Sequence, residues 1–128
     1  GYNHRFNLSD GILIKDNHIQ AAGSISQALA ACQGQASDLF EIECESLSQV
    51  VEVLKSSVKP KIIMLDNMSL DDIKEAKKLI GKQCQIEISG NISLENVTDF
   101  AKLGVDFISV GSLTHSVKAT DISLEITE

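Results

Sequence analysis

Hydrophobic and polar positions along the chain repeat one plan, in which a short β-type stretch leads into a helical pattern. Three consecutive segments follow it: FEIECESLSQVVEVLKS, KIIMLDNMSLDDIKEAKKLIG and QIEISGNISLENVTDFAKLG. In each segment a Ser-Leu pair marks the change of pattern, and the three serines are Ser46, Ser69 and Ser93. A serine hydroxyl can accept a hydrogen bond from a free backbone N–H of a first helical turn. We therefore expect a helix to begin at each of these serines.

Residues near both ends of these predicted helices agree with this reading. Gln49 follows Ser46 by three positions, which fits a capping box. The second helix opens with aspartates and closes with lysines, as the helix dipole prefers. Gly81 and Gly104 suit the position just after a helix.

One further unit lies on each side of the three. GILIKDNH predicts a strand, followed by a helix in GSISQALAACQG, and VDFISVG predicts a strand that leads through SLTHS into another helix start. Strands alternating with helices imply a parallel sheet, either in a (β/α) barrel or in an open doubly wound fold. A full barrel takes about 250 residues. A barrel made by this 128-residue chain would therefore be incomplete at its N-terminal end, with no internal domain boundary.

Composition narrows the classes of function. The chain is 43% hydrophobic with a net charge of −7, which predicts a soluble globular protein and argues against nucleic-acid binding. No apolar run is long enough to cross a membrane, and we expect no secretory or transit segment at the start of the chain. Cys32, Cys44 and Cys84 lack metal-site spacing and are odd in number, which predicts reduced thiols in a cytoplasmic protein.

Candidate chemistry lies at the carboxyl ends of the predicted strands, where parallel α/β folds bind ligands. Lys15, Glu43 and Asp66 alternate with apolar residues there and would face the interior of the sheet. Two acids and a lysine on an interior face are stable only as a compensated set or around a cation, so we expect a functional cluster. Turn formation alone is a sufficient reason for Asn17 and Asn67.

The last two strand ends carry a different signal. SGNISL and VGSLTHS each place a glycine beside a predicted helix start, where free N–H groups and the helix dipole attract an anion. Together they predict a phosphate site, although each alone also describes an ordinary βα turn. His115 could reach that phosphate or cap its own turn. His4 and Arg5 form a cationic pair, and Arg5 could grip a carboxylate or remain a solvated loop residue.

Five segments in this order resemble the quinolinate phosphoribosyltransferase family: NHRFNLSDGILIKDNHI, EIECESL, IIMLDN, ISGNISLENV and GVDFISVGSLTHS. The resemblance implies an α/β fold, an incomplete (β/α) barrel that is the C-terminal part of a type II phosphoribosyltransferase barrel. It also implies an enzyme of NAD biosynthesis that joins quinolinate to 5-phosphoribosyl-1-pyrophosphate (PRPP). Nicotinate mononucleotide, pyrophosphate and CO₂ would be the products, Mg²⁺ the cofactor, and a homodimer or higher homo-oligomer the full-length assembly.

The same resemblance implies roles for individual residues. His4, Arg5 and Lys15 would bind quinolinate. Glu43 and Asp66 would lie by the ribose hydroxyls of PRPP and its Mg²⁺, bound directly or through water, and would be catalytic together with Lys15. The loops that receive the 5′-phosphate would contain Ser89, Gly90, Asn91, Gly111 and His115. Asn91 departs from the Gly-Gly form common in the family.

The resemblance further implies that residues 1–128 are the C-terminal portion of the catalytic barrel domain, without the N-terminal domain and the first barrel strands. The chain alone is then expected to have little activity. Three alternatives remain open: a molybdenum-transport-associated relative with the same barrel, a non-catalytic phosphate- or nucleotide-binding module, and an assembly fragment without a ligand.

Overall fold

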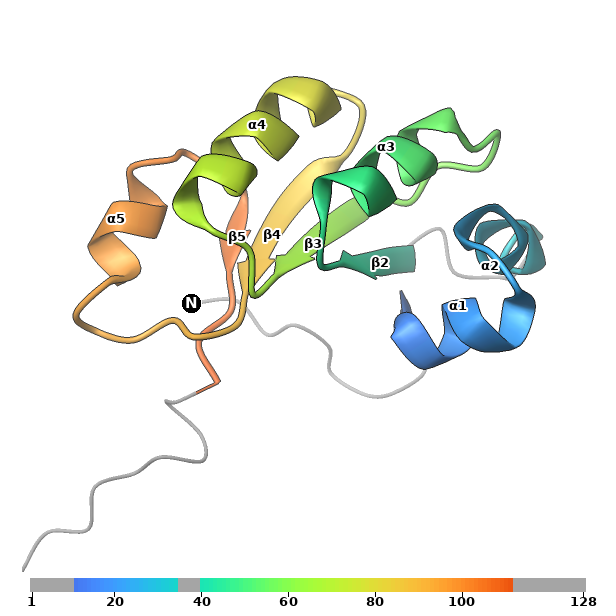
Figure 1. The fold of residues 1–128 in the computed structure, drawn as a ribbon, viewed down its shortest axis with the longest axis horizontal. Coiled ribbons are helices and arrows are strands. Elements are labelled where there is room, and N and C mark those ends of the chain that lie inside the picture. Colours follow the sequence, from blue (N-terminus) through green and yellow to red (C-terminus); the bar gives the residue numbers. More distant parts are fainter. Residues whose placement is uncertain (1–10, 35–39, 112–128) are drawn as a thin grey trace, which may run out of the picture.

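The computed structural model describes residues 11–34 and 40–111, which form a sheet of five parallel strands with helices packed against it (Figure 1). The strands are β1 (Ile12–Ile14), β2 (Phe40–Cys44), β3 (Ile62–Asp66), β4 (Gln85–Ser89) and β5 (Phe107–Ile108). The helices are α1 (Asp16–Ala22), α2 (Ile25–Ala31), α3 (Leu47–Lys55), α4 (Leu70–Ile80) and α5 (Val97–Ala101).

The strand order decides between the two predicted architectures. Neighbours in the sheet follow the chain order β1-β2-β3-β4-β5. A doubly wound sheet reverses its order at a switch point, with helices on both faces. Here the order does not reverse, and α3 and α4 lie over the same face (Figure 1). The connectivity is that of a (β/α) barrel, and the sheet remains open, so the predicted incomplete barrel is confirmed.

The core lies between this face of the sheet and the helices. Parallel pairing aligns Ile42 with Ile63 and Ile63 with Ile86, and the next layer aligns Cys44, Leu65 and Ile88 in the same way. All six side chains are at most 3% exposed. The helices meet them with fully buried residues, namely Leu29, Val50, Val53, Ile73, Ala76 and Ile80. Apolar burial on this face is therefore the main stabilising contribution to the fold.

The opposite face of the sheet, which is the interior of the incomplete barrel, carries acidic side chains among apolar ones such as Met64. Pairing aligns Glu43 with Met64 and Met64 with Glu87, and it aligns Asp66 with Ser89 one layer nearer the carboxyl ends. Glu87 is only 3% exposed and accepts a hydrogen bond from the Ser109 hydroxyl. The alternation predicted from the sequence is thus confirmed across three strands.

Ser46 caps α3 as predicted, although the capping box differs from the expected one. Its hydroxyl accepts a hydrogen bond from the Gln49 backbone N–H at 3.4 Å. The Gln49 side-chain oxygen accepts from the backbone N–H of Glu45, at 2.7 Å, and not from that of Ser46. Gln49 therefore holds the backbone of Glu45, the residue directly after β2.

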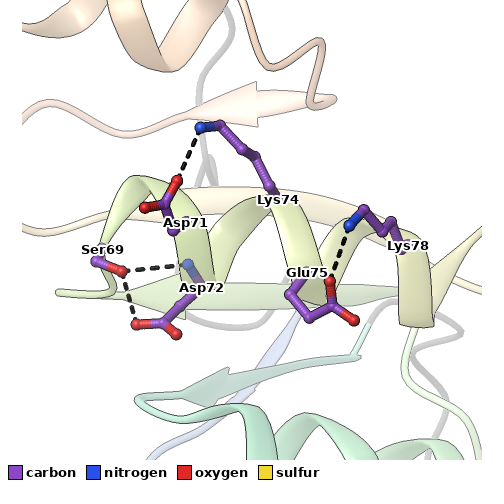
Figure 2. Close-up of polar contacts among 6 residues, drawn as sticks. All are labelled: Ser69, Asp71, Asp72, Lys74, Glu75 and Lys78. Atoms are coloured by element: carbon purple, nitrogen blue, oxygen red, sulfur yellow. Dashed lines mark hydrogen bonds and ion pairs between the residues drawn. The ribbon is translucent and has the colours of Figure 1, made fainter.

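Ser69 caps α4, the longest helix described, and polar contacts continue along its exposed face (Figure 2). The Ser69 hydroxyl accepts from the Asp72 N–H at 3.1 Å and donates to the Asp72 carboxylate at 2.7 Å. Ion pairs join Lys74 to Asp71 and Lys78 to Glu75 (Figure 2). The aspartates lie in the first turn and Lys77 and Lys78 in the last, as the sequence pattern predicted.

The third predicted cap, Ser93, is present, although the regular part of α5 begins only at Val97. The Ser93 hydroxyl accepts a hydrogen bond from the Glu95 N–H at 3.3 Å, and the Ser93 carbonyl oxygen accepts from the Val97 N–H at 2.9 Å. The side chain of Asn96 adds two more hydrogen bonds to this first turn. Its Oδ1 accepts a hydrogen bond from the Ser93 N–H at 2.8 Å, and its Nδ2 donates to the carbonyl oxygen of Asn91 at 2.9 Å. The first of these bonds is the reciprocal half of a capping box, with asparagine in place of Glu or Gln, and the second joins the loop after β4 to this first turn.

The segment after β1 is also not the simple turn that the sequence suggested. Residues 16–22 form α1, with Lys15 at its N-cap and the backbone N–H of Lys15 donating to Nδ1 of His18 at 3.0 Å. A histidine side chain thus takes the place of the Glu or Gln of a capping box. This contact holds the backbone at Lys15, a predicted site residue.

We predict that Ile63→Ala lowers the free energy of unfolding by about 2–5 kcal/mol, because it opens a cavity in the middle of the core. Ile63 is fully buried on β3, the central strand. The matched control is Leu94→Ala, at a side chain that is 82% exposed, where the change should stay within about 0.5 kcal/mol. Urea titration of both variants measures the difference, and equal losses would contradict the assignment of the core.

Candidate functional site

Side chains from three neighbouring strands meet at the carboxyl edge of the sheet. Lys15 directly follows β1, Glu43 lies near the end of β2, and Asp66 is the last residue of β3. The Lys15 Nζ lies 3.8 Å from the Glu43 Oε2. The structure therefore brings together the cation and the carboxylates that the sequence placed on one interior face.

A third carboxylate belongs to this group. Glu43, Glu45 and Asp66 each have a side-chain oxygen within 4.8 Å of the other two. The sequence pattern did not assign a role to Glu45, although alternation along FEIECE already placed it on the same face as Glu43. Glu45 is exposed, whereas the Glu43 side chain is only 15% exposed. The carboxylates thus form a trio that extends from the interior to the mouth of the site.

The negative charge of the trio is only partly balanced by nearby positive charge. Burial raises the pKa of the Glu43 carboxyl above its ordinary 4.5, and the neighbouring charges of Asp66, Glu45 and Asp16 raise it further. Lys15 lowers the pKa of Glu43, but less than burial raises it. The Lys15 side chain is itself 51% exposed, so water weakens its effect. An additional positive charge at this place would relieve the repulsion.

The donor set of the trio fits a hard divalent cation. Carboxylate oxygens are the ligands that Mg²⁺ takes from proteins, with water completing its octahedral shell. Oxygen atoms from three side chains within 4.8 Å of one another are close enough to share an ion or its bound waters. Glu43 and Asp66 were the predicted metal residues, and the structure adds Glu45 as a third potential ligand.

Asn67 connects the trio to the next strand. Its Nδ2 donates to the Asp66 Oδ2 at 2.6 Å, and its backbone N–H donates to the carbonyl oxygen of Ser89 at 3.1 Å. The Nδ2 of Asn91 donates to the Asn67 Oδ1 at 3.0 Å. Turn formation alone is thus an incomplete explanation of Asn67, which also contacts two other site segments.

Gly90 shows how closely the predicted phosphate loop lies against this group. Its φ is +85°, and a Cβ added there would stand 2.3 Å from the Asn67 Oδ1 and 2.8 Å from the Asn67 backbone nitrogen. Only glycine permits both this backbone conformation and this approach. The loop after β4 and the carboxylate trio therefore form one continuous site.

Other predicted residues have simpler outcomes. Ser89 ends β4 beside Asp66, and Gly111 lies on the same sheet edge, three residues after β5. His4, Arg5 and His115 lie outside the described residues, so their predicted roles stay predictions.

The cysteines take no part in the site. All three thiols are free, and burial raises the pKa of Cys44 to about 12 and raises those of Cys32 and Cys84 as well. A thiol with a raised pKa is a poor nucleophile near neutral pH.

Within residues 11–34 and 40–111, none of the helices has the length and apolar character needed to cross a membrane.

Comparison with known proteins agrees with the architecture. The family described as "Quinolinate phosphoribosyl transferase, C-terminal domain" matches residues 1–125. The chain is 43% identical over 129 residues to the probable nicotinate-nucleotide pyrophosphorylase (carboxylating) of Bacillus subtilis, covering 99% of the chain and 44% of that protein. It is 43% identical over 144 residues to quinolinate phosphoribosyltransferase (decarboxylating) 1 of Nicotiana glauca, covering 98% and 41%.

Solved structures give the same result in three dimensions. The crystal structure of NadC from Streptococcus pyogenes superimposes with a TM-score of 0.82 at 47% identity, over 98% of this chain and 44% of that one. The nicotinate-nucleotide pyrophosphorylase of Ehrlichia chaffeensis superimposes with a TM-score of 0.84 at 41% identity, over 99% and 46%. The chain thus spans less than half the length of each of these relatives.

We predict that Glu43→Gln stabilises the fold at neutral pH. Because the folded pKa of Glu43 lies above its unfolded value, the folded state binds more protons in that window, and stability falls as pH rises through it. The amide removes this loss, so the melting temperature should exceed that of the wild type at pH 7–8, with the gain shrinking below about pH 4. The lost contact to a half-exposed lysine contributes little in opposition.

The control for this measurement is Glu75→Gln on α4, where the carboxylate is half exposed and paired with Lys78 at 2.9 Å. It should show no comparable gain at neutral pH. Thermal unfolding followed between pH 3 and pH 8 compares the two variants. A Glu43→Gln variant less stable than the wild type at pH 7 would contradict the assigned cause of the pKa shift.

We predict that Gly90→Ala destabilises the chain more than Gly34→Ala does. The two glycines have nearly the same φ, +85° and +82°, so an alanine at either adds about 1–2 kcal/mol of backbone strain. A Cβ at Gly34 meets nothing within 4 Å, whereas a Cβ at Gly90 collides with Asn67. That collision should add about 1–3 kcal/mol. Chemical denaturation measures both, and equal losses would argue against the close packing of the loop.

Proposed function

Because this chain belongs to the quinolinate phosphoribosyl transferase family, we propose that it forms the C-terminal portion of the catalytic barrel of an enzyme of NAD biosynthesis. That enzyme transfers the phosphoribosyl group of PRPP to quinolinate with loss of CO₂, giving nicotinate mononucleotide and pyrophosphate. The observation that carries this proposal is the meeting of Lys15, the carboxylate trio and the Gly90 loop at one sheet edge. These three parts suit a dianionic acceptor, a ribose with its metal ion, and a phosphate.

The acceptor end is cationic. Lys15 stands with its side chain half exposed, so its ammonium group is available to a carboxylate of quinolinate while it remains near Glu43. Arg5 and His4 would add the bidentate and hydrogen-bonding contacts that a pyridine dicarboxylate requires. Local cations are needed here because the protein as a whole is anionic, with a net charge of −7.

The donor end would receive PRPP along the edge from β2 to β5. Backbone N–H groups are the natural partners of a phosphate where glycine keeps side chains away. The 5′-phosphate would lie on the loops that contain Ser89, Gly90, Asn91, Gly111 and His115. The ribose hydroxyls would then fall beside Glu43 and Asp66, one to two strands away in the sheet.

The carboxylates supply the electrostatic part of catalysis. As pyrophosphate leaves, positive charge develops on the ribose ring, and fixed negative groups nearby stabilise that transition state. Glu43 is suited to this role because it is already partly desolvated, which strengthens its interaction with a positive sugar. Mg²⁺, held by Glu43 and Asp66 with help from Glu45, would neutralise pyrophosphate charge. No side chain need act as a covalent nucleophile.

Decarboxylation follows on the nucleotide adduct. The ring nitrogen is quaternary once the ribose is attached, so its positive charge stabilises the electron pair left on ring carbon C2 when the carboxylate there leaves as CO₂. C2 then takes a proton from water, which gives nicotinate mononucleotide. Lys15 would hold the remaining carboxylate in place during this step.

The larger assembly follows from the same proposal. Residues 1–128 would complete their barrel with strands supplied by an N-terminal portion of the enzyme, and the full-length subunit would form a homodimer or higher homo-oligomer. Free thiols are typical of reducing compartments, which supports a cytoplasmic location.

Two other readings are less well supported. The relatives described above are named for quinolinate or for nicotinate-nucleotide chemistry, which favours that activity over a molybdenum-transport-associated role. A phosphate-binding module without catalysis would need only the Gly90 loop. Such a module would not explain why three carboxylates gather beside Lys15 with their negative charge only partly balanced.

The test is pyrophosphate release from PRPP and Mg²⁺, with and without quinolinate. It uses this chain and a chimera in which the chain replaces the matching C-terminal part of the Streptococcus pyogenes relative. The chimera should release pyrophosphate only with quinolinate, and the chain alone should be at least about 100-fold slower. Lys15→Met in the chimera should lower kcat/KM by about 100-fold or more.

Lys78→Met is the matched control, because it removes another lysine that pairs with a glutamate, on the exposed face of α4. It should leave kcat/KM within about twofold of the unsubstituted chimera, since a surface ion pair contributes little. Quinolinate-independent release by the chimera would refute the substrate assignment.

A further inference from the structure

An amide relay links the phosphate loop to the carboxylate trio. It consists of Asn67 and Asn91, whose side chains meet through the Asn91 Nδ2 and the Asn67 Oδ1 at 3.0 Å. At one end the Asn67 Nδ2 donates to the Asp66 Oδ2 at 2.6 Å. At the other end the Asn91 carbonyl oxygen accepts from the side chain of Asn96 at 2.9 Å. Polar contacts thus run without a break from Asp66 to the turn that precedes α5.

Both members of the amide relay hold an unusual backbone conformation. In the described part of the chain, Asn67 and Asn91 are the two non-glycine residues with positive φ, at 53° and 52°. Asparagine tolerates this region better than most residues, yet the conformation still carries strain. The strained pair lies across the two strand ends that form the proposed site. Here the strain has an evident result, which is that both side chains point toward one another.

We propose that Asn67 and Asn91 are positioning residues that fix the orientation of the Asp66 carboxylate and couple it to the loop of residues 89–92. The inference rests on the proposed function, which gives Asp66 and this loop to different parts of one substrate. Neither asparagine need touch a reacting atom for the relay to work.

The physical reason is the two-sided chemistry of an amide. Asn67 can present either its NH₂ or its oxygen to Asp66, and only the NH₂ is compatible with a carboxylate. The donor on Asn91 selects the same orientation, because it requires the oxygen of Asn67 to face the loop. Each contact therefore enforces the other. Removal of the Asn91 amide would leave Asn67 free to turn and Asp66 free to change rotamer.

The relay has a consequence for binding. A ligand that shifts the loop of residues 89–92 would move the donor on Asn91, and the shift would reach Asp66 through one intermediate side chain. A ligand bound at the phosphate loop would then change the affinity of the carboxylate trio for its own ligand, and the reverse would hold to the same extent. A carboxylate trio oriented in this way should bind a divalent cation better than one in which Asp66 is loose.

The experiment compares Asn91→Gly, Asn67→Gly and the double variant with the wild-type chain. Glycine accepts the positive φ at both positions, so the backbone is kept while the amides are removed. The probe is Mn²⁺ alone, whose free concentration is measured by electron paramagnetic resonance. Each single variant should bind Mn²⁺ about 10-fold more weakly than the wild type, as loss of outer contacts to metal ligands typically does.

The double variant distinguishes a relay from two independent structural roles. In a relay, Asn91 acts only through Asn67, so the double variant should bind Mn²⁺ no more weakly than Asn67→Gly does. Asn17→Ala is the control, because it removes an exposed asparagine side chain just after β1, at the same sheet edge. Its Mn²⁺ affinity should equal that of the wild type. Unchanged affinity in Asn91→Gly, or losses that multiply in the double variant, would overturn the inference.

Two measurements separate this inference from the proposed function: Mn²⁺ binding by Asp66→Asn, and NMR of the chain without any ligand. If the wild-type chain and Asp66→Asn bind Mn²⁺ equally, the metal role proposed for Asp66 fails. The relay is then judged from NMR signals of the Asn67 side-chain amide and the Asp66 Cγ. Both signals should move in Asn91→Gly and stay in place in Asn17→Ala. An Asp66 Cγ signal that does not respond to Asn91→Gly would overturn the relay by itself.

Discussion

The parallel register of β2, β3 and β4 is the constraint on which the rest of the structure depends. In this register Ile42, Ile63 and Ile86 lie side by side beneath the helices, and Glu43 and Asp66 come to the same edge of the opposite face. A shift of one residue in any strand would exchange the two faces, exposing isoleucines and burying carboxylates. Apolar burial on one face therefore fixes the position of the polar groups on the other. The strand pairing that forms the core therefore also positions the residues of the site.

The polar face is tolerated because its charges are distributed in depth. Glu87 is buried and accepts a hydrogen bond from Ser109, Glu43 is partly buried beside Lys15, and Glu45 is exposed at the mouth. A carboxylate that is only partly compensated opposes folding at neutral pH, and the core must offset that cost. Such a cost is typical of functional sites, where groups are arranged for a ligand and not for stability.

The loop after β4 shows how local hydrogen bonds connect a helix cap to the site. Ser93 and Leu94 carry the same signal as the serine-leucine pairs that open α3 and α4, and Ser93 caps the turn before α5. The Asn96 side chain accepts a hydrogen bond from the Ser93 N–H and donates to the carbonyl oxygen of Asn91. The turn holds Asn91 by its carbonyl oxygen, and Gly90 lets the loop approach Asn67. The cap of the turn before α5 and the close approach of the loop to Asn67 thus belong to one connected set of contacts.

Residue pattern alone determined the alternation of strands and helices, the serine caps of α3 and α4, and the interior direction of Lys15, Glu43 and Asp66. These features depend on residues only a few positions apart in the chain, so the sequence alone is enough to predict them. Three of the residues expected in the site, His4, Arg5 and His115, lie outside the described part of the chain, and the fold adds nothing to what the sequence implies for them.

Only the tertiary structure decided between a barrel and a doubly wound sheet, because strand order is a property of pairing between distant segments. It also decided that Glu45 joins the carboxylate trio and that Asn67 and Asn91 bond to each other. The asparagines are 24 positions apart in the chain, and their contact exists because β3 and β4 end side by side. An asparagine that only forms a turn and an asparagine that links two strand ends look the same in a sequence. The contact with the neighbouring strand end distinguishes the two roles, and only the tertiary structure shows that contact.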